Sequence, residues 1–436
     1  MNDAAAPISL DILELVFGPQ RHWNFSVRLW NGTTLAGAGE PRFVLTLNEP
    51  SSLRAALAPP ADLNPGRAFV EKLIDIEGDI EAAVDAMALA DERLSKIRAA
   101  QVALRLLRLP KPRYADDGTQ PRLRGKLHSR HRDAAAIGFH YDQPVAFYRT
   151  FLSDELVYSC AYYDEGVETL EEAQRAKIDY TLRKLRLRPG ETLLDIGCGW
   201  GTLVMRAAQF FGAKALGITL SRRQYEEARR RIANAGLEGR ASVELRDYRD
   251  LGTRTFDKIV SVGMVEHVGR SALPAYFRAA LRALRPGGFF LNHGIADQSP
   301  PRRGYRSTGF LARYVFPDGE LLPIWGMLQF AEQHGFEVRD VENLREHYAR
   351  TLRDWVANLE RNREAAIAAT DERTYRVWRL YMAGSAQGFT RGRMGLFQTL
   401  LAKPDPERKV PLPATRRDLY RQPAVQAVGT TPFERR

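Results

Sequence analysis

The chain has 436 residues, of which 44% are hydrophobic, enough for two or three globular domains with ordinary cores. No run approaches the roughly 20 apolar residues of a membrane span, and MNDAAAPISLDILELVFG at the start carries acids where a signal peptide would carry Lys or Arg. Two cysteines, Cys160 and Cys198, are too few for a disulfide framework, so we expect a cytoplasmic protein. The net charge of +11 points to an anionic partner, either nucleic acid or an anionic membrane surface.

The first 105 residues predict a small α+β domain. RFVLTLN (42–48) alternates like a strand, and residues 68–108 contain helical spacing of apolar residues with a turn at Gly78. Because this region holds no catalytic constellation, we expect an accessory domain for dimerisation, substrate presentation or membrane contact.

Much of the positive charge falls in the Pro- and Gly-containing segment 104–133. Its basic residues are mixed with leucines and a single aromatic residue, Tyr114, whereas a groove for single-stranded nucleic acid needs several aromatic residues to stack on bases. We therefore predict a basic linker over 106–135 that lies near lipid head groups, and no nucleic acid partner. The alternative is a solvated linker.

Residues 136–436 are predicted to form the catalytic domain, because strands alternate with helices from about residue 170. Such alternation predicts an α/β doubly wound parallel sheet with ligands at the carboxyl ends of its strands. Two later strands are expected around a helical insertion, at 336–344 and 394–404. The five earlier candidates are ETLLDIGC (191–198), AKALGITL (213–220), ASVELRD (241–247), FDKIVSVG (256–263) and GGFFLNHGIA (287–296).

The segment LLDIGCGWG (193–201) places three glycines after the first of these strands. Glycines at a strand-to-helix turn let the backbone approach a ligand closely. The spacing is G-x-G-x-G instead of G-x-G-x-x-G, and the second strand ends at Thr219 without the acid that grips a dinucleotide ribose. The lysine of a phosphate-binding loop is also missing. A nicotinamide cofactor and a nucleoside triphosphate are therefore disfavoured.

An acid-x-Gly-x-Gly pattern at this turn resembles the S-adenosylmethionine (SAM) site of Rossmann-like class I methyltransferases, the alternative being an ordinary tight turn. The resemblance implies that the glycines make room for the methionine moiety, that the second strand end holds the ribose, and that the turn after the third strand lies beside the adenine. The residues so assigned are Asp195, Gly197, Cys198, Gly199, Thr219, Leu220, Ser221, Gln224, Tyr248 and Arg249.

Further segments narrow the family over roughly residues 135–405. They are FHYDQPVAFYRTFLSDELVYSCAYYDEG, LLDIGCGWG, DYRDL, IVSVGMVEHVG, LNHGIA and YVFPDGELLP, in this order. Together they resemble the cyclopropane-fatty-acyl-phospholipid synthases, which are related to the mycolic acid cyclopropane synthases. The resemblance implies transfer of the SAM methyl group to the cis double bond of an acyl chain in a membrane phospholipid. It also implies SAM contacts at Tyr158 and Ser159 and a homodimer. The basic linker and the N-terminal domain lead us to expect peripheral association with the inner face of the cell membrane.

Attack of an alkene on a methyl sulfonium leaves a carbocation that must be kept from water and then lose a proton. Aromatic side chains could line such a site, and the candidates are Phe139, Tyr141, Tyr148, Tyr162 and Tyr163, unless they are ordinary core residues. The resemblance implies that a bound bicarbonate takes the proton. It would be held by Glu266, His293 and Tyr348 and by the backbone amides of Cys160 and Ile295.

Each of these assignments has a structural alternative. Glu266 could be an acid paired with an arginine, and His293 a core histidine. Loss of the proton from another carbon would give a methylene- or methyl-branched chain instead of a ring. We predict no metal site, because the histidines are scattered singly. The rival functions are a methyltransferase with a different substrate and a non-catalytic lipid-binding protein.

Overall fold

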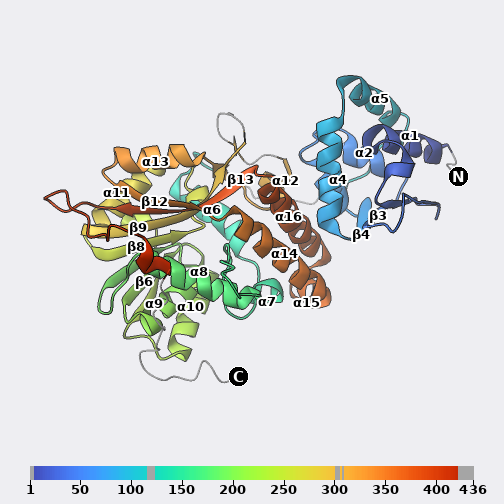
Figure 1. Ribbon diagram of the computed structural model, residues 1–436. Coiled ribbons are helices and arrows are strands. Elements are labelled where there is room, and N and C mark those ends of the chain that lie inside the picture. The colour runs from blue at the N-terminus through green and yellow to red at the C-terminus, as the bar shows by residue number, and fades with distance from the viewer. Residues whose placement is uncertain (1–3, 115–122, 300–304, 307–308, 421–436) are drawn as a thin grey trace. The chain divides into compact units, whose positions relative to one another are not determined.

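The computed structural model describes residues 4–114, 123–299, 305–306 and 309–420, which are drawn as ribbons in Figure 1. The chain divides into two compact units. Unit 1 comprises residues 1–121, 307–317 and 359–387, and unit 2 comprises the remainder. Among the described residues, no helix has both the length and the apolar content needed to cross a membrane.

Unit 1 is built on a four-stranded sheet in the order β2-β1-β3-β4. β1 and β3 are parallel and the other pairs are antiparallel, and β3 is the strand predicted from RFVLTLN. The presence of both helices and a sheet confirms the prediction of a small α+β domain. Its strands are β1 (Ser26–Arg28), β2 (Thr34–Leu35), β3 (Phe43–Leu47) and β4 (Ile74–Gly78). Its helices are α1 (Ala5–Phe17), α2 (Ser52–Leu57), α3 (Asn64–Val70), α4 (Ile80–Arg93), α5 (Lys96–Leu106), α12 (Gly309–Tyr314), α15 (Arg363–Ala369) and most of α16 (Glu372–Thr390).

The boundaries of unit 1 differ from the continuous domain 1–105 and linker 106–135 expected from the sequence. Two buried arginines of α16 explain why the segment 359–387 belongs to this unit. Arg376 donates through Nε to the carbonyl oxygen of Phe69 at 2.7 Å, and Arg379 donates through Nη1 to that of Ile76 at 3.0 Å. These bonds join residues about 300 positions apart, so no local sequence pattern predicts them. Part of the predicted linker is helical, because α6 (Arg130–Tyr141) begins within it.

Unit 2 contains a seven-stranded sheet in the order β12-β13-β9-β8-β5-β6-β7. β7, β6, β5, β8 and β9 are parallel, whereas β13 is antiparallel to both β9 and β12. All seven predicted strands are present, and the predicted α/β class I methyltransferase sheet is confirmed. The bounds are β5 (Thr192–Ile196), β6 (Lys214–Thr219), β7 (Ala241–Leu245), β8 (Phe256–Val262), β9 (Leu284–Asp297), β12 (Glu337–Asn343) and β13 (Met394–Ala402).

Helices cover both faces of this sheet. The helices that contribute to unit 2 are α6, α7 (Val145–Leu152), α8 (Leu170–Lys184), α9 (Thr202–Phe210), α10 (Arg222–Asn234), α11 (Leu273–Ala283), α13 (Ile324–Gln333), α14 (Arg345–Arg361) and α17 (Arg417–Tyr420). A short pair of strands, β10 (Tyr305–Arg306) and β11 (Glu320–Leu321), lies outside the main sheet.

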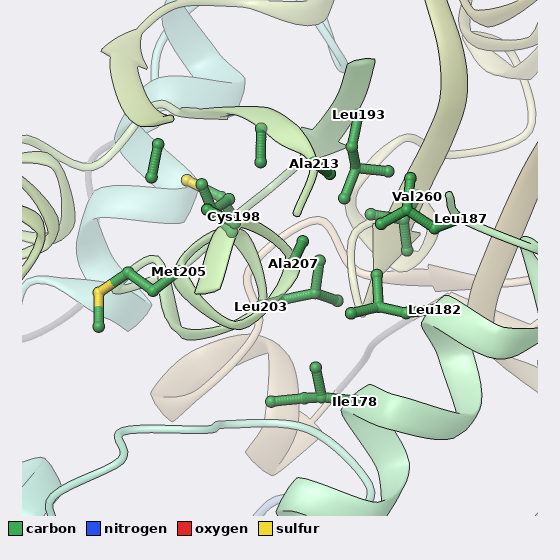
Figure 2. Close-up of a cluster of buried hydrophobic side chains, with 14 of the residues drawn as sticks. Ile178, Leu182, Leu187, Leu193, Cys198, Leu203, Met205, Ala207, Ala213 and Val260 are labelled. Atoms are coloured by element: carbon green, nitrogen blue, oxygen red, sulfur yellow. The ribbon is translucent and has the colours of Figure 1, made fainter. Parts of the chain in front are cut away.

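Alternate residues of β5 face two separate hydrophobic cores. Leu193 belongs to the core that includes α8, α9 and α10, and Figure 2 shows it with Ile178 and Leu182 of α8 and Leu203 of α9. Leu194 belongs to the core that includes α11 and α13. Because β5 is buried on both faces and paired on both edges, its carboxyl end is held rigidly.

The chain leaves β5 for β6 on one side and later returns to β8 on the other. Strand order reverses at this point, which leaves a crevice at the carboxyl ends of β5 and β8 where ligands bind in open α/β sheets. The glycine turn after β5 lies at this crevice.

Candidate active site

The turn between β5 and α9 is shaped by glycines with left-handed backbone. Gly197 and Gly201 have φ values of +87° and +81°. The amides of Gly197 and Cys198 both donate to the carbonyl oxygen of Ile218 in β6 at 3.0 Å, which ties the turn to the sheet. A Cβ at position 197 would lie 3.1 Å from Met264 Cγ. The turn therefore needs glycine both for its backbone angles and for the space beside Met264.

A cavity in unit 2 opens over this turn. Eleven of the twelve predicted SAM-binding residues line it. They are Tyr158, Ser159, Asp195, Gly197, Cys198, Gly199, Thr219, Leu220, Gln224, Tyr248 and Arg249.

The twelfth predicted SAM ligand, Ser221, does not line the cavity. Its hydroxyl caps the N-terminus of α10 by accepting from the amide of Gln224 at 3.2 Å, and it donates to Asp142 Oδ1 at 3.0 Å. Ser221 thus holds α10, and the cavity wall is formed by Thr219 and Gln224, which are hydrogen-bonded to each other at 2.8 Å. A direct contact of Ser221 with SAM stays a prediction, and the structure gives this residue a helix-capping role.

Asp195 is a buried acid near the carboxyl end of β5 and lines the cavity. Its Oδ1 atom has no hydrogen-bond partner within the part of the chain that the structure describes. Burial raises the pKa of this carboxyl to about 7, and the positive charge of Lys177 acts in the opposite direction. An unpaired buried carboxylate oxygen is costly unless a ligand supplies a donor. Asp195 is therefore placed to hold a donor group of a bound molecule.

Lys177 is a cavity residue that the sequence motifs did not single out. It lies in the middle of α8, is buried, and donates through Nζ to Ser159 Oγ at 2.8 Å. Burial lowers the pKa of Lys177 to about 8, while the neighbouring Cys160 and Asp195 raise it. One cation therefore fixes the serine of the YSC segment and offsets part of the charge of Asp195. The sequence signal that could have identified Lys177 is a lysine within a helix whose other residues pack in a core.

At the other end of the cavity, Arg249 is held by acids from two elements. It donates to Asp247 through Nε at 2.8 Å and Nη2 at 2.6 Å, and to Asp133 of α6 at 3.2 Å. Its guanidinium carbon lies 5.3 Å from the centroid of the Tyr248 ring. Tyr248 begins the short 3-10 helix η2 (Tyr248–Asp250). Tyr248 and Arg249 thus provide a flat wall of the kind that a purine ring can stack on.

Glu266 follows the carboxyl end of β8, and His293 lies within the adjacent strand β9. Glu266 lies on the 3-10 helix η3 (Val265–His267), and its Oε1 accepts from the amide of Ile295 at 2.7 Å. The turn sits closely on β9, because a Cβ at Gly294 would lie 2.3 Å from Val265 Cγ1. Neither Glu266 nor His293 lines the cavity itself, which is bordered by their neighbours Gly263, Met264 and His267.

In each of these two side chains, one polar atom has a hydrogen-bond partner and the other has none among the described residues. Gln398 Nε2 of β13 lies 3.1 Å from His293 Nδ1. With the amide nitrogen as donor, Nδ1 accepts and the neutral ring carries its hydrogen on Nε2. Burial lowers the pKa of His293 well below its ordinary value, and Lys177 and Lys184 lower it further, so the ring is neutral. His293 Nε2 and Glu266 Oε2 are buried, and no described residue forms a hydrogen bond with either atom.

Burial raises the pKa of Glu266 to about 7, and the Ile295 amide acts in the opposite direction. The pair therefore offers one donor, His293 Nε2–H, and one acceptor, Glu266 Oε2, and both atoms are buried. These are the groups that a small oxyanion with a hydroxyl would satisfy.

The other predicted ligands of the oxyanion are placed differently. The amide of Ile295 donates to Glu266 Oε1 in this structure. Tyr348 lies in the first turns of α14 and packs on Phe389 and Trp355, with centroid distances of 4.7 and 6.0 Å. Cys160 is fully buried, and burial raises the pKa of its thiol.

The five predicted aromatic lining residues separate into two groups. Tyr141 lines the cavity, and its hydroxyl lies 3.2 Å from His267 Nε2. Tyr148 is a core residue that donates to the carbonyl oxygen of His140 at 2.9 Å. Tyr162 stacks on Tyr180 and His347, and Tyr163 donates to Asp354 Oδ2 at 2.5 Å. Phe139 is half-buried in α6.

The aromatic side chains that line the cavity are Tyr141, Tyr158, Trp200 and Tyr248, so one of the five predicted aromatic residues is among them. Tyr158 also packs on Trp355, at a centroid distance of 5.1 Å. Tyr158 and Tyr348 thus contact the same indole ring, which links the cavity wall to α14.

Comparison with known proteins identifies the family of this chain. Residues 128–399 match the family described as mycolic acid cyclopropane synthetase. A probable fatty acid methyltransferase from Pseudomonas putida is 40% identical over 405 residues, covering 92% of this chain and 97% of that protein. Cyclopropane mycolic acid synthase 1 of Mycobacterium tuberculosis is 38% identical over 280 residues, covering 61% of this chain and 95% of that protein.

Two solved structures agree with this assignment. The cyclopropane synthase MmaA2 from Mycobacterium tuberculosis aligns with a TM-score of 0.59 and 33% identity, covering 64% of this chain and 100% of that one. Mycolic acid cyclopropane synthase CmaA1, in complex with SAH and CTAB, aligns with a TM-score of 0.57 and 35% identity, covering 62% and 97%. The chain therefore belongs to the mycolic acid cyclopropane synthetase family of SAM-dependent methyltransferases.

Proposed function

We propose that the protein transfers the methyl group of SAM to the cis double bond of an acyl chain in a membrane phospholipid and closes a cyclopropane ring. The observation that carries the proposal is the pairing of two sites. A glycine-shaped cavity at the carboxyl end of β5 adjoins a turn at which the buried atoms Glu266 Oε2 and His293 Nε2 lack partners among the described residues. The relatives named for cyclopropane synthesis and fatty acid methylation support the reaction class.

The residues of the cavity fit SAM, because Asp195 Oδ1 needs a donor and the glycine turn leaves room for a ligand against the backbone. When bound, SAM supplies an electrophilic methyl group on a positively charged sulfur. Asp195, Ser159 and the glycine turn would orient the methionine end, while Lys177 fixes Ser159. Thr219 and Gln224 would hold the ribose, and Tyr248 and Arg249 the adenine.

The alkene needs no base for its attack, because its π electrons form the new carbon–carbon bond as the carbon–sulfur bond breaks. The product of this step is a carbocation, and the cavity walls keep water away from it. Tyr141, Tyr158 and Trp200 present aromatic faces that stabilise a cation. The methyl transfer would leave S-adenosylhomocysteine as the sulfur product. Loss of a proton from the transferred methyl group to a base would then close the ring.

The residues around Glu266 fit a bicarbonate ion, which when bound supplies a base for this proton. His293 would donate to the ion from Nε2, and Glu266 Oε2 would accept its hydroxyl hydrogen. Roles for Tyr348 and the Cys160 amide remain part of the proposal. A role for the Ile295 amide requires that its bond to Glu266 be shared or replaced.

The experiment is incubation of the purified protein with methyl-labelled SAM and vesicles of a monounsaturated phospholipid. We expect label in the acyl chains, as a cyclopropane ring by mass spectrometry and proton NMR. Label in a methylene or methyl branch would retain the acyl-chain methyltransferase and overturn ring closure. Absence of label from lipid while SAM binds would overturn the lipid substrate and favour a different acceptor. Peripheral association with the inner membrane face and a homodimer remain predictions.

A further inference from the structure

Helix α5 of unit 1 exposes an apolar stripe to solvent. Ile97, Leu104 and Leu107 are 74%, 66% and 68% exposed, and they are three of the seven large apolar side chains exposed among the described residues. With Ala100 they are spaced three, four and three positions apart, so they share one face of the helix and of its helical C-cap residue Leu107. Isolated exposed leucines are ordinary, whereas a continuous stripe of this kind marks an interaction site.

The opposite face of α5 is firmly held by its own unit. Val102 and Leu106 are buried, and Arg105 forms an ion pair with Asp11 of α1 at 3.6 Å. The chain after the helix is also tied down, because Arg54 donates to the carbonyl oxygen of Leu109 at 2.7 Å. The exposed stripe is therefore carried by a fixed helix and is not the result of a loose terminus.

The segment around the stripe carries only positive charge. Residues 94–114 contain six Lys and Arg residues and no Asp or Glu. Arg98 and Arg108 are exposed on or beside the stripe. Exposed aliphatic side chains flanked by long cationic ones are the composition of helices that lie in the plane of an anionic membrane surface.

We propose that this α5 face, defined as Ile97, Ala100, Leu104 and Leu107 with the flanking Arg98 and Arg108, docks on the surface of an anionic phospholipid bilayer. The inference rests on the proposed function, in which the acyl chain to be methylated resides in a membrane. The aliphatic side chains enter the boundary between head groups and acyl chains, while the arginine stems lie along it and keep their charges among the phosphates.

A second copy of this chain is a poorer occupant of the same face. A two-fold contact brings the same patch of both copies together. Here it would set the cations of one α5 against those of the other without an intervening acid from residues 94–114. Lipid phosphates, in contrast, complement the charge and leave the leucines in an apolar layer.

The test is flotation of the full-length protein with vesicles of dioleoylphosphatidylglycerol or dioleoylphosphatidylcholine. We expect binding to the anionic vesicles that weakens with salt, and a loss of at least about tenfold in the triple variant I97S/L104S/L107S. The charge variant R98E/R108E should also lose binding to anionic vesicles, and it tests the face if the serine variant does not fold. Trp325→Ser, which removes an exposed apolar side chain of unit 2, is the matched control and should bind as the wild type does.

Two readouts separate this proposal from the proposed function. Methylation of monounsaturated phospholipid dispersed in detergent should be equal in wild type and the α5 variants, whereas methylation of anionic vesicles should fall with binding. Wild-type protein that leaves the detergent-dispersed lipid unlabelled would overturn the function and not the docking face.

Three results would overturn the docking face. The α5 variants could bind vesicles as the wild type does, or only Trp325→Ser could lose binding. Light scattering could also show that the α5 variants turn an oligomer into a monomer, which would make the face an interface between copies.

Discussion

The two halves of the candidate site are built in different ways. The turn after β5 is a local structure, made by residues 195–201 and shaped by positive-φ glycines, and the amides of Gly197 and Cys198 tie it to β6. The turn around Glu266 is assembled from β8, β9 and β13, and its polar groups are paired on one side and unpaired on the other. In the proposed function, the backbone shape of the first half serves SAM binding, whereas the unpaired buried atoms of the second half serve proton removal. Substitutions in the two halves should therefore affect different measurements.

The largest effect is expected for Glu266→Gln. The amide oxygen can still accept from Ile295, but the uncharged group cannot accept a hydroxyl hydrogen as strongly or balance the developing charge. We expect kcat to fall roughly a thousandfold with less than about a threefold change in SAM affinity. Label transfer and calorimetric SAM titration measure the two quantities. Equal loss of both would show that Glu266 maintains the fold.

The pH dependence of kcat should report the same carboxyl group. Burial raises the pKa of Glu266 to about 7, and the carboxylate is the form proposed to act, so activity should rise with pH through this value. Below it, kcat should fall about tenfold per pH unit. No limb from His293 is expected near neutrality, because its pKa lies well below the ordinary value.

Asp195 complicates a profile taken at low SAM concentration, because burial also raises its pKa to about 7. The titration of Asp195 should appear in the pH dependence of kcat/KM for SAM. The variant Asp195→Asn should remove this contribution. A pH-independent kcat in the wild-type protein would contradict the role proposed for Glu266.

Gly197→Ala probes the binding half of the comparison. The new Cβ would meet Met264 at 3.1 Å and force a left-handed backbone on alanine. We expect about 1–2 kcal/mol lower free energy of unfolding and roughly tenfold weaker SAM binding, with kcat at saturating SAM retained. Gly190→Ala is the matched control, because Gly190 also has a positive φ but lies outside the cavity. It should lose stability alone, and weaker SAM binding there would remove the distinction.

A smaller effect is expected for Gln398→Leu. Loss of the donor to Nδ1 frees His293 to carry its hydrogen on either nitrogen, so a fraction of the rings presents no Nε2–H. We expect kcat to fall about tenfold without a change in SAM affinity, and ring nitrogen chemical shifts should show the mixed tautomers. Thr399→Val, on the other face of β13, should leave kcat unchanged. An unchanged kcat in Gln398→Leu would show that the tautomer of His293 does not affect the reaction.

The smallest effect is expected for Ser221→Ala, which distinguishes the structure from the sequence-based assignment. Because Ser221 caps α10 and does not line the cavity, its loss should lower the free energy of unfolding by about 1 kcal/mol. SAM affinity should change less than about twofold, since Thr219 and Gln224 form the wall. A tenfold loss of SAM affinity with unchanged stability would restore the direct contact.

The SAM-binding half of the candidate site could be predicted from the sequence because its residues lie close together in the chain. The G-x-G-x-G spacing within residues 195–201 predicted the turn. The alternation of strands and helices predicted where the strands end. Ser221 shows the limit of this reasoning. A serine at a helix start satisfies either a ligand or its own helix, and only the position of α10 relative to the cavity decides between them.

The catalytic half depended on residues far apart in the chain. Family resemblance named Glu266 and His293, but residue types alone left a structural acid and a core histidine open. The positions of Gln398 and the Ile295 amide showed which atoms of these side chains are paired. Lys177 and the aromatic walls were likewise decided by packing, because a helix or loop offers several faces and the sequence does not say which one borders a cavity.

The sequence by itself determined the fold class and the glycine turn, since both depend on periodicity and on backbone angles that few residue types adopt. Tertiary structure alone decided the division into units, where arginines of α16 bind carbonyl groups about 300 positions away. It also decided which polar atoms stay unpaired. Hydrogen bonding and burial are properties of neighbours in space, and the order of residues in the chain specifies those neighbours only after folding.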